Sequence, residues 1–189
     1  RPTVRACFTG YIVQAVVNNF APLLFLTFQS RLGISLDRIA LLTSLNFAIQ
    51  LATDAAAAKF VDRIGYRAAL VGAHVLSLLG LLGLAILPNV LAQPFAGLVA
   101  SVAVYAVGGG MIEVLVSPVV EACPTEGKAA AMSLLHSFYC WGHMGVVLLS
   151  TLFFALFGIE RWPVLAALWA LVPLAGVLLF TQVPIPTLV

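Results

Sequence analysis

The sequence predicts an all-α membrane protein with six transmembrane helices, and three observations carry this prediction. Of its 189 residues, 62% are hydrophobic and 8% are charged, whereas a soluble domain carries about 25% charged residues. The nine basic and seven acidic residues are separated by long uncharged stretches. These stretches are continuously apolar, which excludes the alternating polarity of outer-membrane barrel strands.

The first two helices follow from two stretches near the N-terminus. Residues 6–30 carry no charge, and about 20 apolar residues span a bilayer, so a helix is predicted over residues 6–29. This stretch is too long for a signal peptide and lacks a small-residue cleavage site. Residues 39–58 hold Asp54 as their one charge, which predicts a second helix over residues 39–60.

The remaining four helices follow from longer stretches. The uncharged run that begins at Ala68 continues for 45 residues, which is too long for one span. Two prolines, Pro88 and Pro94, divide it, because the residue before a proline is disfavoured in a helix. Two more uncharged stretches follow Lys128 and Arg161. The predicted helices therefore cover residues 68–87, 94–119, 129–157 and 161–183.

The distribution of lysine and arginine orients these helices. With a cytoplasmic N-terminus, the basic residues divide into an inner set (Arg1, Arg5, Lys59, Arg63, Arg67 and Lys128) and a smaller outer set (Arg31, Arg38 and Arg161). Cytoplasmic loops of membrane proteins carry the excess of lysine and arginine. The sequence therefore predicts a multi-pass protein of the cell (cytoplasmic) membrane with its N-terminus in the cytoplasm.

The residue types also disfavour several function classes. So little charge excludes a nucleic-acid-binding domain, and the three dispersed cysteines suggest neither a disulfide framework nor a zinc site. His136 and His143 lie seven residues apart on one helical face and could bind a metal, but without nearby acids or thiols a polar patch is the favoured interpretation. We expect no metal, no cofactor and no catalytic set, and hence no enzyme.

Two acids, Asp54 and Glu113, lie inside the predicted helices, where no lysine or arginine can pair with them. Each precedes an acid at a cytoplasmic helix end by eight residues, or about 12 Å along a helix. His136 reaches about the same level. Charged groups in a bilayer are costly and usually face a cavity used for transport. We favour a proton or solute role for Glu113 over a structural hydrogen bond, whereas for Asp54 both interpretations stay open.

Other polar and small residues within the helices add two expectations. Asn18 and Asn19 are unusual in hydrocarbon, so one of them should face a cavity. The run Gly108-Gly109-Gly110, followed by Pro118, predicts a helix that approaches a neighbour closely and bends.

The connection between the second and third helices reads Ala58-Lys59-Phe60-Val61-Asp62-Arg63-Ile64-Gly65-Tyr66-Arg67. It resembles the signature Gly-x-x-x-Asp-Arg-x-Gly-x-Arg of the major facilitator superfamily, matched at Asp62, Arg63, Gly65 and Arg67, with Ala58 in place of the first glycine. In that superfamily this cytoplasmic loop is a conformational latch between two six-helix halves. The resemblance assigns the same role to Asp62, Arg63 and Arg67.

A second motif is similar to one branch of that superfamily, the fucose:proton symporter-like permeases. The segment Glu113-Val114-Leu115-Val116-Ser117-Pro118 looks like the Glu-x-x-x-Asn-Pro of their fourth helix, where the glutamate belongs to the sugar and proton site. Ser117 replaces the asparagine of that motif, His136 stands where the fucose permease has a glutamine, and Pro22 stands where it has an aspartate. We therefore expect a different proton route, one that uses Asp54 with Glu113.

The resemblance implies that residues 1–189 form the N-terminal half of a twelve-helix transporter, with inverted three-helix repeats at about 1–90 and 91–189. Because the chain runs from Arg1 to the apolar Val189, we expect a piece of a longer protein whose C-terminal six-helix half is absent. The implied activity is alternating-access movement of a small, sugar-like polar solute across the lipid bilayer, coupled to protons. The implied solute and proton site contains Glu113, Asp54, Asn18, Asn19, His136 and His143.

Three alternatives stay open. The first is a drug or metabolite exporter of the same superfamily, although proton-driven exporters typically have an arginine in helix four and this chain has none there. The second is a self-contained six-helix scaffold or half-transporter. The third, an intramembrane enzyme, would need a catalytic set that the sequence does not supply.

Overall fold

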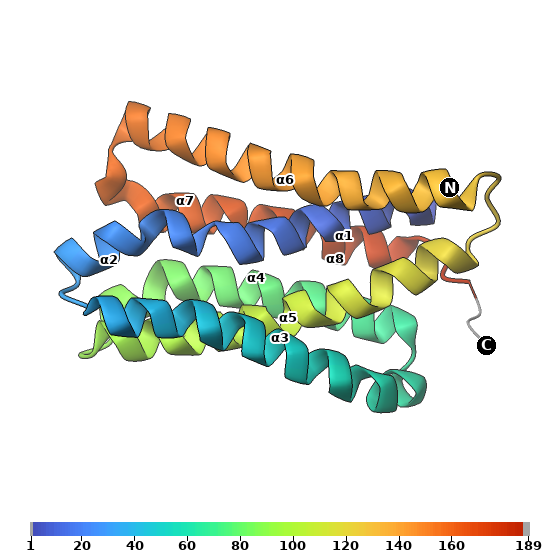
Figure 1. Ribbon diagram of the computed structural model, residues 1–189, viewed down its shortest axis with the longest axis horizontal. Coiled ribbons are helices and arrows are strands. Elements are labelled where there is room, and N and C mark those ends of the chain that lie inside the picture. Colours follow the sequence, from blue (N-terminus) through green and yellow to red (C-terminus); the bar gives the residue numbers. More distant parts are fainter. Residues whose placement is uncertain (1, 187–189) are drawn as a thin grey trace.

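Six helical spans follow one another in the computed structural model, and the chain reverses direction after each of them (Figure 1). The structure describes residues 2–186 and contains no strand within that range. All six spans are long and apolar enough to cross a membrane: Pro2–Arg31, Leu36–Ile64, Tyr66–Val90, Pro94–Ala122, Lys128–Phe157 and Ile159–Gln182. The predicted all-α class with six membrane-spanning helices is confirmed.

The four middle spans are single helices, whereas the first and last are divided. The middle ones are α3 (Leu36–Ile64), α4 (Tyr66–Val90), α5 (Pro94–Ala122) and α6 (Lys128–Phe157). The first span consists of α1 (Pro2–Asn19), the 3-10 helix η1 (Ala21–Leu24) and α2 (Phe25–Arg31). The last consists of the 3-10 helix η2 (Ile159–Arg161), α7 (Trp162–Trp169) and α8 (Leu171–Gln182).

The continuous helices predicted over 6–29 and 161–183 are therefore wrong in one respect, and proline explains both interruptions. A proline inside a helix removes one hydrogen bond and clashes with the carbonyl four residues earlier. Pro22 lies within η1, and Pro173 lies at the beginning of α8, just after the break at Ala170. Pro88, by contrast, lies inside α4, which ends at Val90 rather than at residue 87.

The connection between α3 and α4 also differs from its prediction as a loop over residues 58–67. Helix α3 continues to Ile64 and α4 begins at Tyr66, so Gly65 is the one non-helical residue between them. Gly65 has φ +89°, a conformation that glycine adopts without the steric penalty of a side chain. Helix α3 includes charged residues such as Asp62, so the uncharged stretches underestimate helix length.

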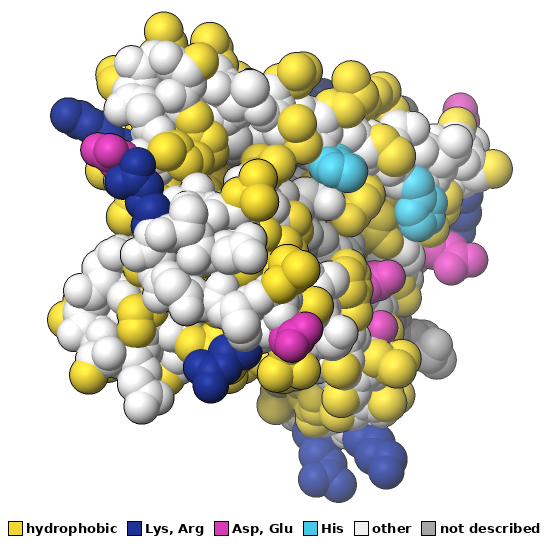
Figure 2. All heavy atoms as spheres, turned by 60° about the vertical axis from the view of Figure 1, so that its left-hand side comes forward, with side chains coloured by type: hydrophobic (Ala, Val, Ile, Leu, Met, Phe, Trp, Pro, Cys, Tyr) yellow, Lys and Arg dark blue, Asp and Glu magenta, His cyan; other side chains and the backbone are white. Residues whose placement is uncertain are grey.

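Helices α1 and α5 are the most enclosed parts of the molecule, and α6 is the least. About 61% of the membrane-spanning window is buried in the first and fourth spans, but only 17% in α6. Large apolar side chains are therefore exposed on α3 and α6, among them Leu41, Leu51, Trp141 and Leu148. Figure 2 shows hydrophobic side chains over one face of the molecule, with lysine and arginine mostly at its margins. Such a surface suits contact with lipid tails.

Candidate functional site

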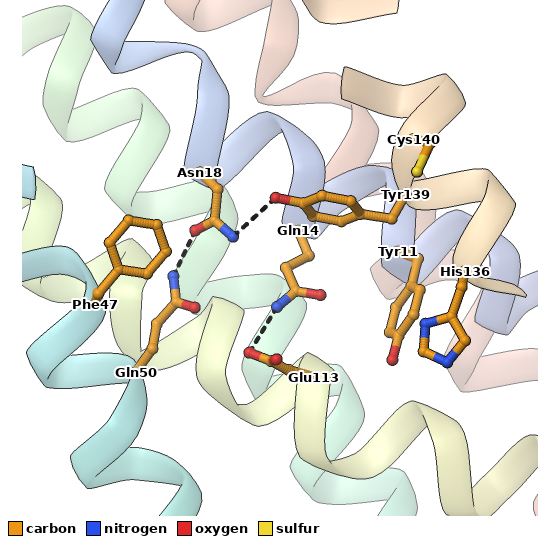
Figure 3. A pocket seen from close by; sticks show the side chains of 9 residues that line it. All are labelled: Tyr11, Gln14, Asn18, Phe47, Gln50, Glu113, His136, Tyr139 and Cys140. Atoms are coloured by element: carbon orange, nitrogen blue, oxygen red, sulfur yellow. Dashed lines mark hydrogen bonds between the residues drawn. The ribbon is translucent and has the colours of Figure 1, made fainter. Parts of the chain in front are cut away.

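A cavity of about 450 Å³ lies between α1, α3, α5 and α6, near the middle of the spans (Figure 3). Gln50, at the midpoint of α3, is one of the residues that line it. Most of the lining side chains are polar or aromatic: Tyr11, Gln14, Asn18, Phe47, Gln50, Glu113, His136, Tyr139 and Cys140. A cavity of this size falls in the range of small-molecule sites, about 300–1,000 Å³.

Helical spacing brings these residues to one place. Residues three, four or seven positions apart share one face of a helix. On α1 this spacing places Tyr11, Gln14 and Asn18 on the face toward the cavity. On α6 the same spacing groups His136 with Tyr139 and Cys140, so two helices present polar faces to each other across the cavity.

The carboxylate of Glu113 is held by α1. Gln14, which is buried, donates a hydrogen bond from Nε2 to Glu113 Oε2 at 2.9 Å. One turn further along α5, the Ser117 and Tyr11 hydroxyl oxygens are 2.9 Å apart and hydrogen-bonded. The Tyr11 ring lies 5.5 Å from the imidazole of His136, measured between ring centroids. The acid is therefore bonded to an amide donor, and the Tyr11 and His136 rings line the same cavity.

A network of amides forms the other wall of the cavity. Asn18 Oδ1 accepts hydrogen bonds from Gln50 Nε2 at 2.6 Å and from Asn46 Nδ2 at 3.1 Å, and Gln50 also donates to Asn46 Oδ1 at 3.1 Å. The Tyr139 hydroxyl accepts one bond from Asn18 Nδ2 and one from Asn19 Nδ2, each at 3.3 Å. Because the Tyr139 oxygen accepts both bonds, its own O–H stays available as a donor to the cavity.

Glycines in α5 allow α3 to bring Gln50 into this network. A Cβ atom at Gly110 would lie 3.0 Å from the Gln50 backbone, and one at Gly109 would lie 3.3 Å from the Gln50 side-chain nitrogen. Gly108 instead lies against α4, where a Cβ atom would be 2.5 Å from the Ala73 carbonyl oxygen. The glycine run therefore lies at two helix contacts at once, and Pro118 lies within α5 without ending it.

The sequence-predicted site residues divide into three groups. Glu113, Asn18 and His136 line the cavity. Asn19 lies beside it, bonded to Tyr139. The other two, one on α3 and one on α6, do not line it.

Asp54 lies four residues beyond Gln50 on α3, at about the level of Glu113. Its Oδ1 atom is buried without a hydrogen-bond partner among the described residues. His143 lies outside the cavity, in a separate hollow on α6 with Met144, Val147 and Leu148. The structure thus places Asp54 at about the level of Glu113 and His143 outside the cavity.

Six lining residues were not among the predicted site residues: Tyr11, Gln14, Phe47, Gln50, Tyr139 and Cys140. For the amides, a signal exists in the sequence. Gln14 and Asn18 are four residues apart in an apolar helix, and Asn46, Gln50 and Asp54 repeat at intervals of four. Such spacing marks a polar stripe on one helical face. The aromatic residues and Cys140 carry no comparable signal, because apolar residues fill every face of these helices.

The residues of the predicted latch lie at one end of the bundle, where α3 meets α4. Asp62, Arg63 and Arg67 are exposed, and Arg67 Nη1 donates a 2.9 Å hydrogen bond to the Phe180 carbonyl near the end of α8. Within residues 2–186 the one ion pair is Arg31–Glu160, which joins the end of α2 to η2. The same range contains no group of three metal-ligating side chains.

Cys140 makes the cavity accessible to chemical labelling. Cys7 and Cys123 are buried, whereas Cys140 is exposed and lines the cavity. N-ethylmaleimide is therefore expected to modify Cys140 at least about tenfold faster than the other two thiols, since reaction needs access to the sulfur. Peptide mass spectrometry gives the labelled position, and Cys140→Ser is the control. Equal labelling of Cys7 would contradict this account of the cavity.

The chain matches the sequence profile described as Major Facilitator Superfamily over residues 6–188, which is nearly its full length. A search of curated proteins finds no match. The six confirmed spans and the absence of strands from the described part agree with half of the fold of that family. The chain therefore belongs to the Major Facilitator Superfamily, a family of membrane transporters.

Proposed function

We propose that this chain is the N-terminal six-helix half of a proton-coupled secondary transporter that moves a small polar, sugar-like solute by alternating access. The observation that carries the proposal is the cavity near the middle of the spans, which Glu113 lines together with three amide and two phenol side chains. Transporters of this kind bind their solute near the bilayer midplane between two repeats or halves. In this proposal the repeats cover about 1–90 and 91–189, and the N-terminus is cytoplasmic.

The chemistry of the cavity supports a hydroxylated solute. Hydroxyl groups both donate and accept hydrogen bonds, and the cavity offers Glu113 as an acceptor and the Tyr139 hydroxyl as a donor. Phe47 and Tyr11 add apolar ring surface to the lining of the cavity. Among residues 2–186 no lysine or arginine lines the cavity, so a strongly anionic solute would find no lysine or arginine to pair with on this wall.

Proton coupling rests on Glu113 and its neighbour Asp54. Asp54 has a buried carboxylate oxygen without a hydrogen-bond partner among the described residues, which makes it the second candidate to hold a proton. Asp62, Arg63, Gly65 and Arg67 would form the cytoplasmic latch in the same proposal. The similarity of the segment 113–118 to the fucose:proton symporter-like branch supports the assignment of Glu113 as the acid of the site.

The test is uptake by the full-length protein in proteoliposomes, with Glu113→Gln as the variant. Loss of a hydrogen bond to a charged group costs about 1.5–3 kcal/mol, so solute affinity is expected to fall about 10- to 100-fold. Uptake driven by an imposed pH gradient should disappear, because glutamine cannot carry a proton. The first measurement is a screen of labelled sugars and similar polar solutes.

Glu121→Gln is the matched control, since Glu121 is exposed near the end of the same helix and does not line the cavity. Its uptake should equal that of the unmodified protein. Solutes that are transported should also slow the labelling of Cys140. Unchanged proton-driven uptake by Glu113→Gln would contradict the proposed role of Glu113.

A further inference from the structure

Gln14 is the group through which α1 contacts the acid of the cavity. Only 4% of its surface is exposed, and its Nε2 atom donates to Glu113 Oε2 at 2.9 Å. Figure 3 shows the amide oxygen of Gln14 turned away from Glu113. Because Gln14 also lines the cavity, one buried side chain is bonded to the acid and is in reach of a bound solute.

The chemistry of an amide makes this contact sensitive to the proton on Glu113. A carboxylate only accepts hydrogen bonds, whereas a protonated carboxyl also donates one. The two ends of a glutamine amide have opposite roles, since NH₂ donates and C=O accepts. Rotation of the Gln14 amide by a half-turn would present its oxygen to the new O–H of Glu113 and its NH₂ to the cavity.

We propose that Gln14 is a positioning residue that converts protonation of Glu113 into a reversal of hydrogen-bonding polarity in the cavity. With Glu113 ionised, the Gln14 oxygen accepts a hydrogen bond from a solute hydroxyl. With Glu113 protonated by a proton from water, the Gln14 NH₂ group donates there instead. This inference rests on the proposed function, because it takes Glu113 as the acid of a solute site.

Other groups near Glu113 could receive its proton or its hydrogen bond instead. They are Tyr11 on α1, Asp54 on α3, and His136 and Tyr139 on α6. Tyr11 is already bonded to Ser117, and Tyr139 to two asparagines. Asp54 has an unbonded buried oxygen, which makes it the main competitor of Gln14. An experiment must therefore detect the Gln14 amide itself.

Infrared difference spectroscopy provides that readout, with protons as the probe and no need for a known solute. Spectra of the full-length protein in lipid bilayers are recorded at high and low pH. Acidification should produce the carboxyl C=O band of Glu113 together with a shifted amide C=O band of Gln14. Glu113→Gln should remove both bands, which assigns them.

Gln14→Met keeps the length of the side chain but removes both hydrogen-bonding ends. We expect the amide band to be lost and the Glu113 band to move to higher wavenumber, as for a carboxyl with a weaker partner. Gln50→Met is the matched control, because Gln50 lines the same cavity but bonds to Asn18 and Asn46. It should leave both bands in place.

Two results would overturn the inference: a Glu113 band at the same wavenumber in Gln14→Met as in the unmodified protein, or an amide band that persists in that variant. If Gln14→Met does not fold, Gln14→Asn is the substitute, because its amide is one methylene too short to reach Glu113. In that variant the Glu113 band should again move to higher wavenumber, and the amide band should no longer shift with pH. The proposed function fails separately, when Glu113→Gln retains proton-driven uptake. If the Gln14 amide band does not shift with pH while Glu113→Gln still abolishes uptake, only the inference about Gln14 is overturned.

Discussion

Gly80→Ala is expected to lower the free energy of unfolding by about 3 kcal/mol, at the upper end of the usual cost of overpacking. A Cβ atom at Gly80 would lie 2.5 Å from Tyr105 Cβ and 2.6 Å from the Tyr105 backbone nitrogen. These atoms belong to the backbone of α5 or are fixed to it, so no side-chain rotation relieves the clash. The two helices must move apart, and dispersion contacts along their interface are lost.

Gly72→Ala provides the matched control, because it adds the same methyl group to the same helix where no atom lies within 4 Å. Alanine is favoured over glycine in helices by about 1 kcal/mol, so this variant should gain stability. Thermal unfolding of the full-length protein in detergent gives both values. Equal melting temperatures for the two variants would contradict the close approach of α4 and α5.

Asn18→Leu is expected to weaken solute affinity at least about tenfold and to lower stability by about 2 kcal/mol. Asn18 Oδ1 accepts bonds from both Asn46 and Gln50, and leucine has no acceptor. Asn46 is buried at 5% exposure, so its N–H loses its partner, at a cost of about 1–3 kcal/mol for each unsatisfied group. The leucine side chain also replaces a polar wall of the cavity with an apolar one.

The variant Asn19→Leu distinguishes the contribution of Asn19 from that of Asn18. The Asn19 Nδ2 atom donates to the Ala15 carbonyl at 2.9 Å and to the Tyr139 hydroxyl. When Asn19 is replaced, the Ala15 carbonyl keeps its hydrogen bond within α1, and the Tyr139 hydroxyl keeps the bond from Asn18. The loss of stability should therefore be less than half of that caused by Asn18→Leu. Solute protection of Cys140 and thermal unfolding measure the two effects. Equal losses for both variants would show that Asn18 has no special place in the network.

Most of the transmembrane spans could be predicted from charge, because burial of a charge in hydrocarbon is costly wherever it occurs, but the division of the longest uncharged run needed Pro88 and Pro94. The interruptions at Pro22 and Pro173 are harder to predict. Pro88 and Pro118 lie inside unbroken helices of the same chain, so proline by itself does not decide whether a helix ends. Which of these prolines interrupts its helix could therefore not be predicted from the residue type.

The site could be predicted only where polarity distinguishes a residue from its surroundings. Glu113, Asn18 and His136 are polar within apolar helices, and all three line the cavity. His143 has the same polarity and shares a predicted face with His136, but its side chain lies in another hollow. Tyr11 and Phe47 resemble the lipid-facing aromatic residues in type, so their place in the cavity depends on how α1 and α3 are rotated against α5 and α6.

The connection of α3 to α4 by Gly65 alone limits how these two spans can move. Consecutive Cα atoms are 3.8 Å apart, so those of Ile64 and Tyr66 can never separate by more than about 7 Å. A longer loop would let α3 slide or tilt while α4 stayed still, but this connection has no spare length. A displacement of the Ile64 end of α3 by more than this length would therefore have to move the Tyr66 end of α4 with it, and Arg67, one residue further on, is hydrogen-bonded to the Phe180 carbonyl of α8.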